Sequence, residues 1–186
     1  MPAIAIAPKT TAAPFAARET VFSPSFYKPY EEAVTTALML ICQAREQLFE
    51  ETGGDVSAMT FRLKSPASIR DKLIKKGLPV SAAAARAALH DIAGLRVVLA
   101  SESQVYRLAA ILENSPAVQL TDERDYIAAP KESGYRSLHL LLNVPVLLRS
   151  GAAMMVPVEL QLRTASMDIW ASIEHDRVYK PVCLPT

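Results

Sequence analysis

The segment Val156–Thr164 alternates between apolar and polar side chains along its length. Its polar members, one at every second position, are Glu159, Gln161 and Arg163. Because neighbouring side chains of a strand point to opposite faces, this pattern predicts a strand with one buried face and one polar face. Three large polar side chains in register are unusual where a face meets only water or core. We therefore interpret the polar face as one wall of a polar cleft.

The segment Lys131–Leu140 repeats this pattern, with Tyr135, Ser137 and His139 on one face of a predicted strand. Gly134, before the tyrosine, permits close approach of a ligand to the backbone. An aromatic ring, an imidazole, a carboxylate, an amide and a guanidinium on two strand faces suit a nucleotide site, where a ring stacks on a base. The alternative, which local sequence leaves open, is a half-buried core tyrosine and a core histidine with satisfied hydrogen bonds.

Length and composition set limits on the class of protein. A chain of 186 residues, 51% hydrophobic and 21% charged, is typical of a single soluble globular domain. A net charge of +1 does not favour long nucleic acid or an anionic membrane. We expect no membrane partner and a cytoplasmic location, because no apolar run is long enough to span a bilayer and the N-terminus lacks the features of a signal peptide.

The order of the predicted elements is mixed, with an antiparallel pair of strands near the end of the chain, so we expect the α+β class. Residues 1–24, rich in Ala and Pro, are expected to form a flexible tail before a domain at 25–186. Helices are predicted at 25–51, 65–77, 102–114 and 165–179, with a short helix or turn at 81–89. Strands are predicted at 56–64, 93–100, 117–127, 136–147 and 153–163, the last two joined as a hairpin. In the last helix, Ile169, Trp170 and Ile173 are expected to pack on the sheet.

A basic cluster surrounds the predicted junction between a strand and the next helix. Arg62 and Lys64 share a strand face, and Ser68 and Lys72 lie four residues apart on the helix. Cations beside the free amide groups of a helix N-terminus form a phosphate site. A solvated basic helix face is the alternative.

Two carboxylates are candidates for Mg²⁺ ligands. Asp91 comes directly before the predicted buried strand that carries Arg96, where a carboxylate can hold Mg²⁺ or act as a turn cap. Glu159 can bind Mg²⁺ or accept a proton from a hydroxyl nucleophile. A metal phosphohydrolase is not expected, because the three histidines, His90, His139 and His175, are scattered.

Five segments, taken in order, carry a resemblance to a known family. They are RLKSPASIRDK at 62–72, DIAGLR at 91–96, DYIAAPKESGYRSLHL at 125–140, VELQLRT at 158–164 and WASIEH at 170–175. In these segments the chain resembles the synthetase domain of the RelA/SpoT family, and specifically the stand-alone small alarmone synthetases. The resemblance implies a mixed β-sheet flanked by helices, a fold distantly like nucleotidyltransferases. It also implies transfer of the β,γ-pyrophosphate of ATP to the 3′-hydroxyl of GTP or GDP, making pppGpp or ppGpp and releasing AMP.

The resemblance also implies roles for individual residues. The residues implied to bind ATP are Arg62, Lys64, Ser68, Lys72 and Arg96. The residues implied to bind GTP or GDP are Lys131, Tyr135, His139, Gln161 and Arg163. Asp91 and Glu159 are the implied catalytic residues and the implied Mg²⁺ ligands, with Glu159 also activating the 3′-hydroxyl.

Other functions and the assembly state remain open at this point. One alternative is a catalytically weak module that binds purine nucleotides, and another is the same chemistry on an adenine nucleotide or an RNA 3′ end. No stable complex with nucleic acid is expected. Small synthetases usually continue beyond a Tyr-Lys like that at 179–180 with a helical segment used in tetramers. The resemblance therefore leaves a homo-oligomer open, but a tetramer is not expected for a chain ending at Thr186.

Overall fold

Six strands form one mixed sheet in the computed structural model, which describes residues 6–8, 21–148 and 151–179. In spatial order the strands are β1 (Ile6–Pro8), β2 (Val56–Leu63), β3 (Ala93–Leu99), β6 (Ala153–Thr164), β5 (Leu138–Leu147) and β4 (Gln119–Asp125). The pairs β1–β2 and β3–β6 are parallel, and the other neighbours are antiparallel. The sheet therefore has the mixed architecture that the sequence predicts, including the β5–β6 hairpin.

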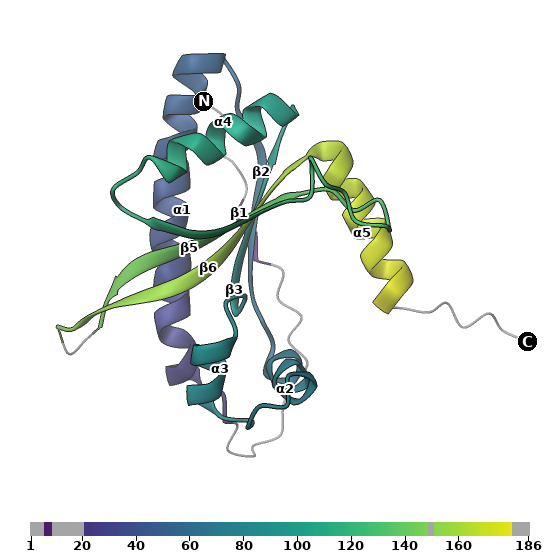
Figure 1. The fold of residues 1–186 in the computed structure, drawn as a ribbon. Coiled ribbons are helices and arrows are strands. Elements are labelled where there is room, and N and C mark those ends of the chain that lie inside the picture. Colours follow the sequence, from purple (N-terminus) through teal and green to yellow (C-terminus); the bar gives the residue numbers. More distant parts are fainter. Residues whose placement is uncertain (1–5, 9–20, 149–150, 180–186) are drawn as a thin grey trace, which may run out of the picture.

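Two helices cover one face of this sheet, namely α1 (Pro24–Thr52) and α4 (Glu102–Glu113) (Figure 1). The apolar residues of the strands, such as Leu95, Leu140 and Leu160, are at most 2% exposed and share one core with α1. Helices α2 (Pro66–Lys75) and α3 (Ala82–Ala88) lie together near one end of the sheet, and α5 (Ala165–Tyr179) follows directly from β6. The polar residues that alternate with the core residues consequently lie on the other face of the sheet.

Local sequence signals explain where several helices begin and end. The Ser65 hydroxyl accepts a hydrogen bond from the Ser68 amide at 3.2 Å, and Pro66 occupies the first turn of α2. The hydroxyl of Ser101 caps α4 in the same way. Helix α1 is capped at its C-terminus by Gly53, whose φ of 66° is the left-handed conformation that glycine adopts without a steric cost.

The structure corrects three predictions about local structure. Part of the predicted tail is ordered, because Ile6–Pro8 pairs with β2 and Phe22 is buried in the core. Strand β5 begins at Leu138, so Tyr135 and Ser137 belong to the preceding loop rather than to the strand. The prediction that Ile169, Trp170 and Ile173 pack on the sheet is wrong. These side chains are 62%, 47% and 46% exposed, because α5 contacts β6 and β3 through its other side, where Met167 and Ala171 are buried.

Some predictions concern parts of the chain outside the described residues. These are the rest of the predicted tail at 1–5 and 9–20, the hairpin residues 149–150, the C-terminal residues 180–186 and the side chain of His175. Within the described part of the chain, no helix is both long and apolar enough to cross a membrane.

Candidate active site

Strand register places the predicted site residues on neighbouring strands of the polar face. Arg96 of β3 lies beside Gln161 of β6, which in turn lies beside His139 of β5. One step along the sheet, Arg62 of β2, Gly94 of β3 and Glu159 of β6 form a second row. Residues distant in sequence thus meet because the parallel β3–β6 pair brings the two halves of the chain together.

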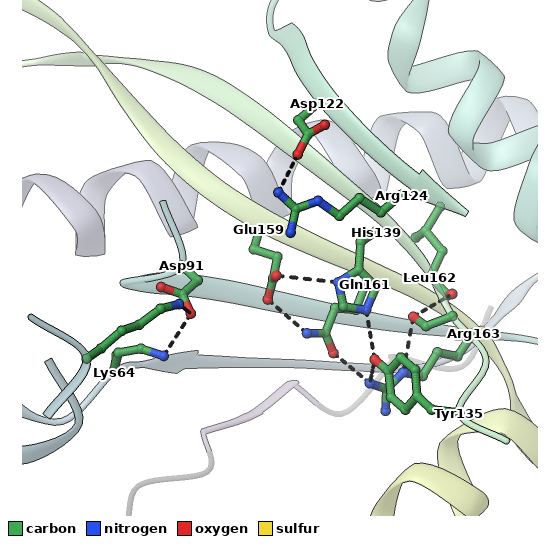
Figure 2. A network of polar contacts seen from close by, with 12 residues as sticks. Lys64, Asp91, Asp122, Arg124, Tyr135, His139, Glu159, Gln161, Leu162 and Arg163 are labelled. Carbon is green, nitrogen blue, oxygen red and sulfur yellow. Dashed lines mark hydrogen bonds and ion pairs between the residues drawn. The ribbon is translucent and has the colours of Figure 1, made fainter. Parts of the chain in front are cut away.

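A chain of hydrogen bonds runs across the β5–β6 side of this face (Figure 2). The Tyr135 hydroxyl lies 2.7 Å from Nε2 of His139, and Nδ1 of His139 lies 3.4 Å from Oε1 of Glu159. The other carboxylate oxygen of Glu159 accepts from the Gln161 amide at 2.8 Å. Arg163 donates through Nη2 to the Tyr135 hydroxyl at 2.6 Å and to Oε1 of Gln161 at 2.8 Å. The five side chains therefore hold one another in position.

This network also fixes the arrangement of protons. Since Arg163 can only donate, the Tyr135 hydroxyl accepts from it and gives its own proton to Nε2 of His139. A neutral His139 then carries its proton on Nδ1, where it faces Glu159. Burial raises the pKa of Glu159, but the hydrogen bond from His139 and that from Gln161 outweigh burial and hold the pKa below its ordinary value. Glu159 is thus an ionised carboxylate at neutral pH.

Arg163 lies beneath the site rather than in it. Its side chain is only 3% exposed, and it contacts Asp168 at 3.2 Å and Ser137 at 3.3 Å besides Tyr135 and Gln161. The sequence predicts that Arg163 binds the nucleotide directly. This role does not fit the position, because its guanidinium group is buried and already contacts protein atoms. The guanidinium lies 5.1 Å from the centre of the Tyr135 ring, so Arg163 supports that ring from within.

The second carboxylate of the site, Asp91, is surrounded by ammonium groups. Lys64 and Lys72 both contact its Oδ2 atom, at 2.8 and 2.6 Å. Burial raises the pKa of Asp91, yet the two lysine contacts outweigh it and the net pKa lies below the ordinary value. The remaining oxygen, Oδ1, is buried and has no hydrogen-bond partner among the described residues. Ser68 is exposed on the first turn of α2 and contacts the Ser65 hydroxyl at 2.9 Å.

Two arginines flank this lysine cluster on the same face of the sheet. The Arg62 side chain crosses Gly94, where an added Cβ would lie 3.7 Å from Cγ of Arg62. Arg96 is half-buried. Burial, Arg163 and Arg62 all lower its pKa, whereas Asp168 at 3.0 Å raises it. The predicted pair Arg62 and Arg96 is therefore brought together, with three guanidinium groups near one another.

The loop before β5 contributes Lys131 and Gly134, which the sequence predicts, and Tyr126, which sequence reasoning missed. The ammonium of Lys131 lies 4.6 Å from the ring centre of Tyr126 and 4.8 Å from that of Tyr135. Gly134 has a φ of 80°, and an added Cβ would lie 3.4 Å from the ring of Trp170. Tyr126 was detectable in principle, since it belongs to the segment 125–140 that carries the resemblance. Asp168 had no such signal, because an acidic residue in the first turn of a helix is common.

The donor set fits a hard divalent cation such as Mg²⁺. Within the described part of the chain, no group of three or more His, Cys, Asp or Glu residues is placed to hold a metal ion. Mg²⁺ commonly uses one or two carboxylates and completes its shell with waters and substrate phosphates. Asp91 and Glu159 are near enough that the charge of Asp91 raises the pKa of Glu159. The unpartnered Oδ1 of Asp91 is the free ligand that such a shell needs.

The fold and this site define a mixed α+β domain with two carboxylates set among cations, and comparison identifies its family. A model described as the region found in RelA / SpoT proteins matches residues 61–182. The chain belongs to the RelA/SpoT family, as the sequence predicts.

Two curated relatives are enzymes of Bacillus subtilis (strain 168). The chain is 40% identical over 119 residues to the GTP pyrophosphokinase YwaC, covering 64% of this chain and 56% of that protein. It is 35% identical over 156 residues to the GTP pyrophosphokinase YjbM, covering 83% of this chain and 72% of that protein. The alignment thus spans little more than half the length of the first of these relatives.

Solved structures confirm the predicted fold class. Small alarmone synthetase 1 from Bacillus subtilis bound to its product pppGpp matches with a TM-score of 0.74 and 35% identity, over 84% of this chain and 79% of that chain. A GTP pyrophosphokinase family protein from Streptococcus pneumoniae matches with a TM-score of 0.75 and 34% identity, over 84% of this chain and 76% of that chain.

Proposed function

We propose that this protein is a GTP pyrophosphokinase. It transfers the β,γ-pyrophosphate of ATP to the 3′-hydroxyl of GTP or GDP, forming pppGpp or ppGpp and AMP. The observation that carries the proposal is the position of Glu159, an ionised carboxylate between a cluster of cations around Asp91 and an aromatic and cationic cluster around Tyr135. The relatives named as GTP pyrophosphokinases support the same reaction.

The donor nucleotide binds on the β2–β3 side of the site in this proposal. Arg62 and Arg96 present guanidinium planes that can stack on adenine, and Lys64, Lys72 and Ser68 face the triphosphate. When the phosphates arrive, they compete with Asp91 for the two lysines. Release of the lysines frees the carboxylate of Asp91, which with Glu159 would hold Mg²⁺. When bound, Mg²⁺ neutralises charge on the migrating phosphates.

The acceptor nucleotide binds on the β5–β6 side. The Tyr135 ring stacks on guanine once Lys131, which lies over that ring, moves to the acceptor's phosphates. His139 and Gln161 line the same side and hold Glu159 by hydrogen bonds. The 3′-oxygen attacks the β-phosphorus of ATP as the bond from that phosphorus to the α–β bridging oxygen breaks, so AMP leaves with that oxygen. Glu159 accepts the proton of the 3′-hydroxyl. The residues act mainly by positioning and by offsetting charge.

A direct assay tests the proposal and its alternatives. The purified chain is incubated with Mg²⁺ and ATP labelled in the γ-phosphate, together with GTP, GDP, GMP, ATP or tRNA as acceptor. We expect the label in pppGpp or ppGpp, one AMP per product, and no product when Mg²⁺ is chelated. Nucleotide binding without product would instead support the regulatory module, and label in an adenine nucleotide or in RNA would change the acceptor. A cytoplasmic location, where ATP and GTP are available, is part of this proposal.

A further inference from the structure

Asp168, in the first turn of α5, joins the two sides of the site. Its Oδ1 atom lies 3.0 Å from Nη1 of Arg96 and 3.2 Å from Nη1 of Arg163. Arg96 belongs to β3, on the side proposed for ATP. Arg163 belongs to β6 and contacts the side proposed for the acceptor. A single carboxylate oxygen is therefore shared by two guanidinium groups that serve different substrates.

Electrostatics explain why this position requires an anion. Arg96 and Arg163 disfavour each other's charge, Arg62 adds a third cation, and burial removes much of the screening by water. Asp168 contacts both the half-buried guanidinium group of Arg96 and the buried one of Arg163, and it offsets this repulsion. Without its charge, the two arginines would separate, and Arg96 would turn toward solvent.

The link continues from Arg163 to the acceptor's stacking ring. Arg163 donates to the Tyr135 hydroxyl at 2.6 Å and lies 5.1 Å from the ring centre. Because Arg163 is 3% exposed, it has little room to compensate for a lost partner by moving to water. A displacement of Arg163 therefore also displaces Tyr135. Among the described contacts, none joins Asp168 directly to that ring.

We infer that Asp168 is a positioning residue that couples the two nucleotide subsites, holding Arg96 for ATP and, through Arg163, Tyr135 for GTP or GDP. This inference rests on the proposed function for the identity of the two nucleotides. Its distinctive consequence is that one substitution on α5 weakens the binding of both substrates.

The test compares Asp168→Asn with wild type and with Glu113→Gln, an exposed residue of α4 that loses the same charge. Calorimetry measures the Kd of GDP and of a non-hydrolysable ATP analogue, and steady-state assays measure KM and kcat for each substrate. We expect Asp168→Asn to raise Kd and KM for both nucleotides roughly tenfold, the size of one lost charge-assisted hydrogen bond, with a smaller change in kcat. Glu113→Gln is expected to match wild type.

A double-mutant cycle separates coupling from a general loss of structure. In a Tyr135→Ala background, Asp168→Asn should no longer weaken GDP binding, because the ring through which it acts is gone, but it should still weaken binding of the ATP analogue. Three results would overturn the inference. They are wild-type affinities in Asp168→Asn, a change in affinity for one nucleotide alone, and additive effects of the two substitutions on GDP binding.

Three further outcomes have definite meanings. If Asp168→Asn does not fold, Asp168→Glu replaces it in the test. This variant keeps the charge but lengthens the side chain by one methylene and so displaces both arginines, and both Kd values should rise together. If neither Kd changes, or if only one of them changes, the coupling is overturned. If the wild type binds both nucleotides but makes no product, the proposed transfer reaction is wrong. The Kd measurements still test the role of Asp168 in that case. If it binds neither nucleotide, both proposals are wrong.

Discussion

Asp91 and Glu159 lie within electrostatic reach of each other, yet the groups around them are held in different ways. Glu159 belongs to a connected network in which Gln161, Arg163, Tyr135 and His139 each contact another member. Among the described residues, Asp91 contacts the ends of two lysines, and its Oδ1 atom has no hydrogen-bond partner.

This difference indicates which side of the site has its side chains held in position in the absence of substrate. Lysine ammonium groups sit on flexible stems, so in the proposed reaction phosphates can draw them away from Asp91. The β5–β6 side holds its planar groups in place through hydrogen bonds, as the proposed stacking and proton transfer require. Changes on that side should therefore affect turnover and acceptor binding, whereas changes at Asp91 should also affect stability through loss of ion pairs.

The largest effect is expected from Glu159→Gln. The substitution keeps the shape of the side chain but removes the proton acceptor and one carboxylate ligand for Mg²⁺. Loss of the base alone should reduce the rate by about 10²–10⁴-fold. Turnover of ATP with saturating GDP measures the effect, and an unchanged melting temperature is the control for folding. Activity near that of wild type would contradict the role of Glu159.

A medium effect is expected at Tyr135, where two substitutions separate the ring from the hydroxyl. Tyr135→Ala removes a stacking partner worth roughly 1–3 kcal/mol, so the KM of the acceptor should rise about tenfold or more. From sequence alone, stacking needs only the ring and Tyr135→Phe should be mild. The structure changes that expectation, because the hydroxyl contacts both His139 and Arg163. We expect Tyr135→Phe to lose about fivefold or more in acceptor use, as two hydrogen bonds are removed.

Melting temperatures of the two Tyr135 variants provide the control. Tyr135 is half-buried, so neither variant should show the loss of about 3–5 kcal/mol that is typical of an emptied aromatic core site. A strongly destabilised Tyr135→Ala variant whose folded fraction binds GDP normally would mean that the tyrosine is structural.

The smallest effect, on stability, is expected from Asp91→Asn and depends on pH. The pKa of Asp91 is lowered in the folded protein, so its ion pairs stabilise the fold above the unfolded pKa of about 4 and cease to do so as pH falls through the folded value. The variant should therefore be less stable than wild type at pH 7, with a difference that shrinks below about pH 4. Urea unfolding at several pH values measures it. A difference independent of pH would contradict the ion-pair account.

Several parts of the fold and site are predictable from local sequence signals. Alternation at Val156–Thr164 predicts β6 and its polar face, and the Ser65-Pro66 pair predicts the start of α2, because these signals depend only on local backbone geometry. The ordered set of motifs predicts the family, which the match over 61–182 confirms. The sequence also selects Asp91 and Glu159 as the two carboxylates, and their roles remain predictions.

The contacts among these residues depend on the tertiary structure. Strand order places β3 beside β6, and this brings Arg96 next to Gln161 although 65 positions in the sequence separate them. Only the packing of α5 on β6 and β3 shows that Asp168 contacts Arg96 and Arg163. Burial likewise converts Arg163 from an expected nucleotide ligand into a support for Tyr135. The physical reason is that local periodicity fixes the face on which a side chain lies, whereas its partners depend on which distant strands and helices pack beside it.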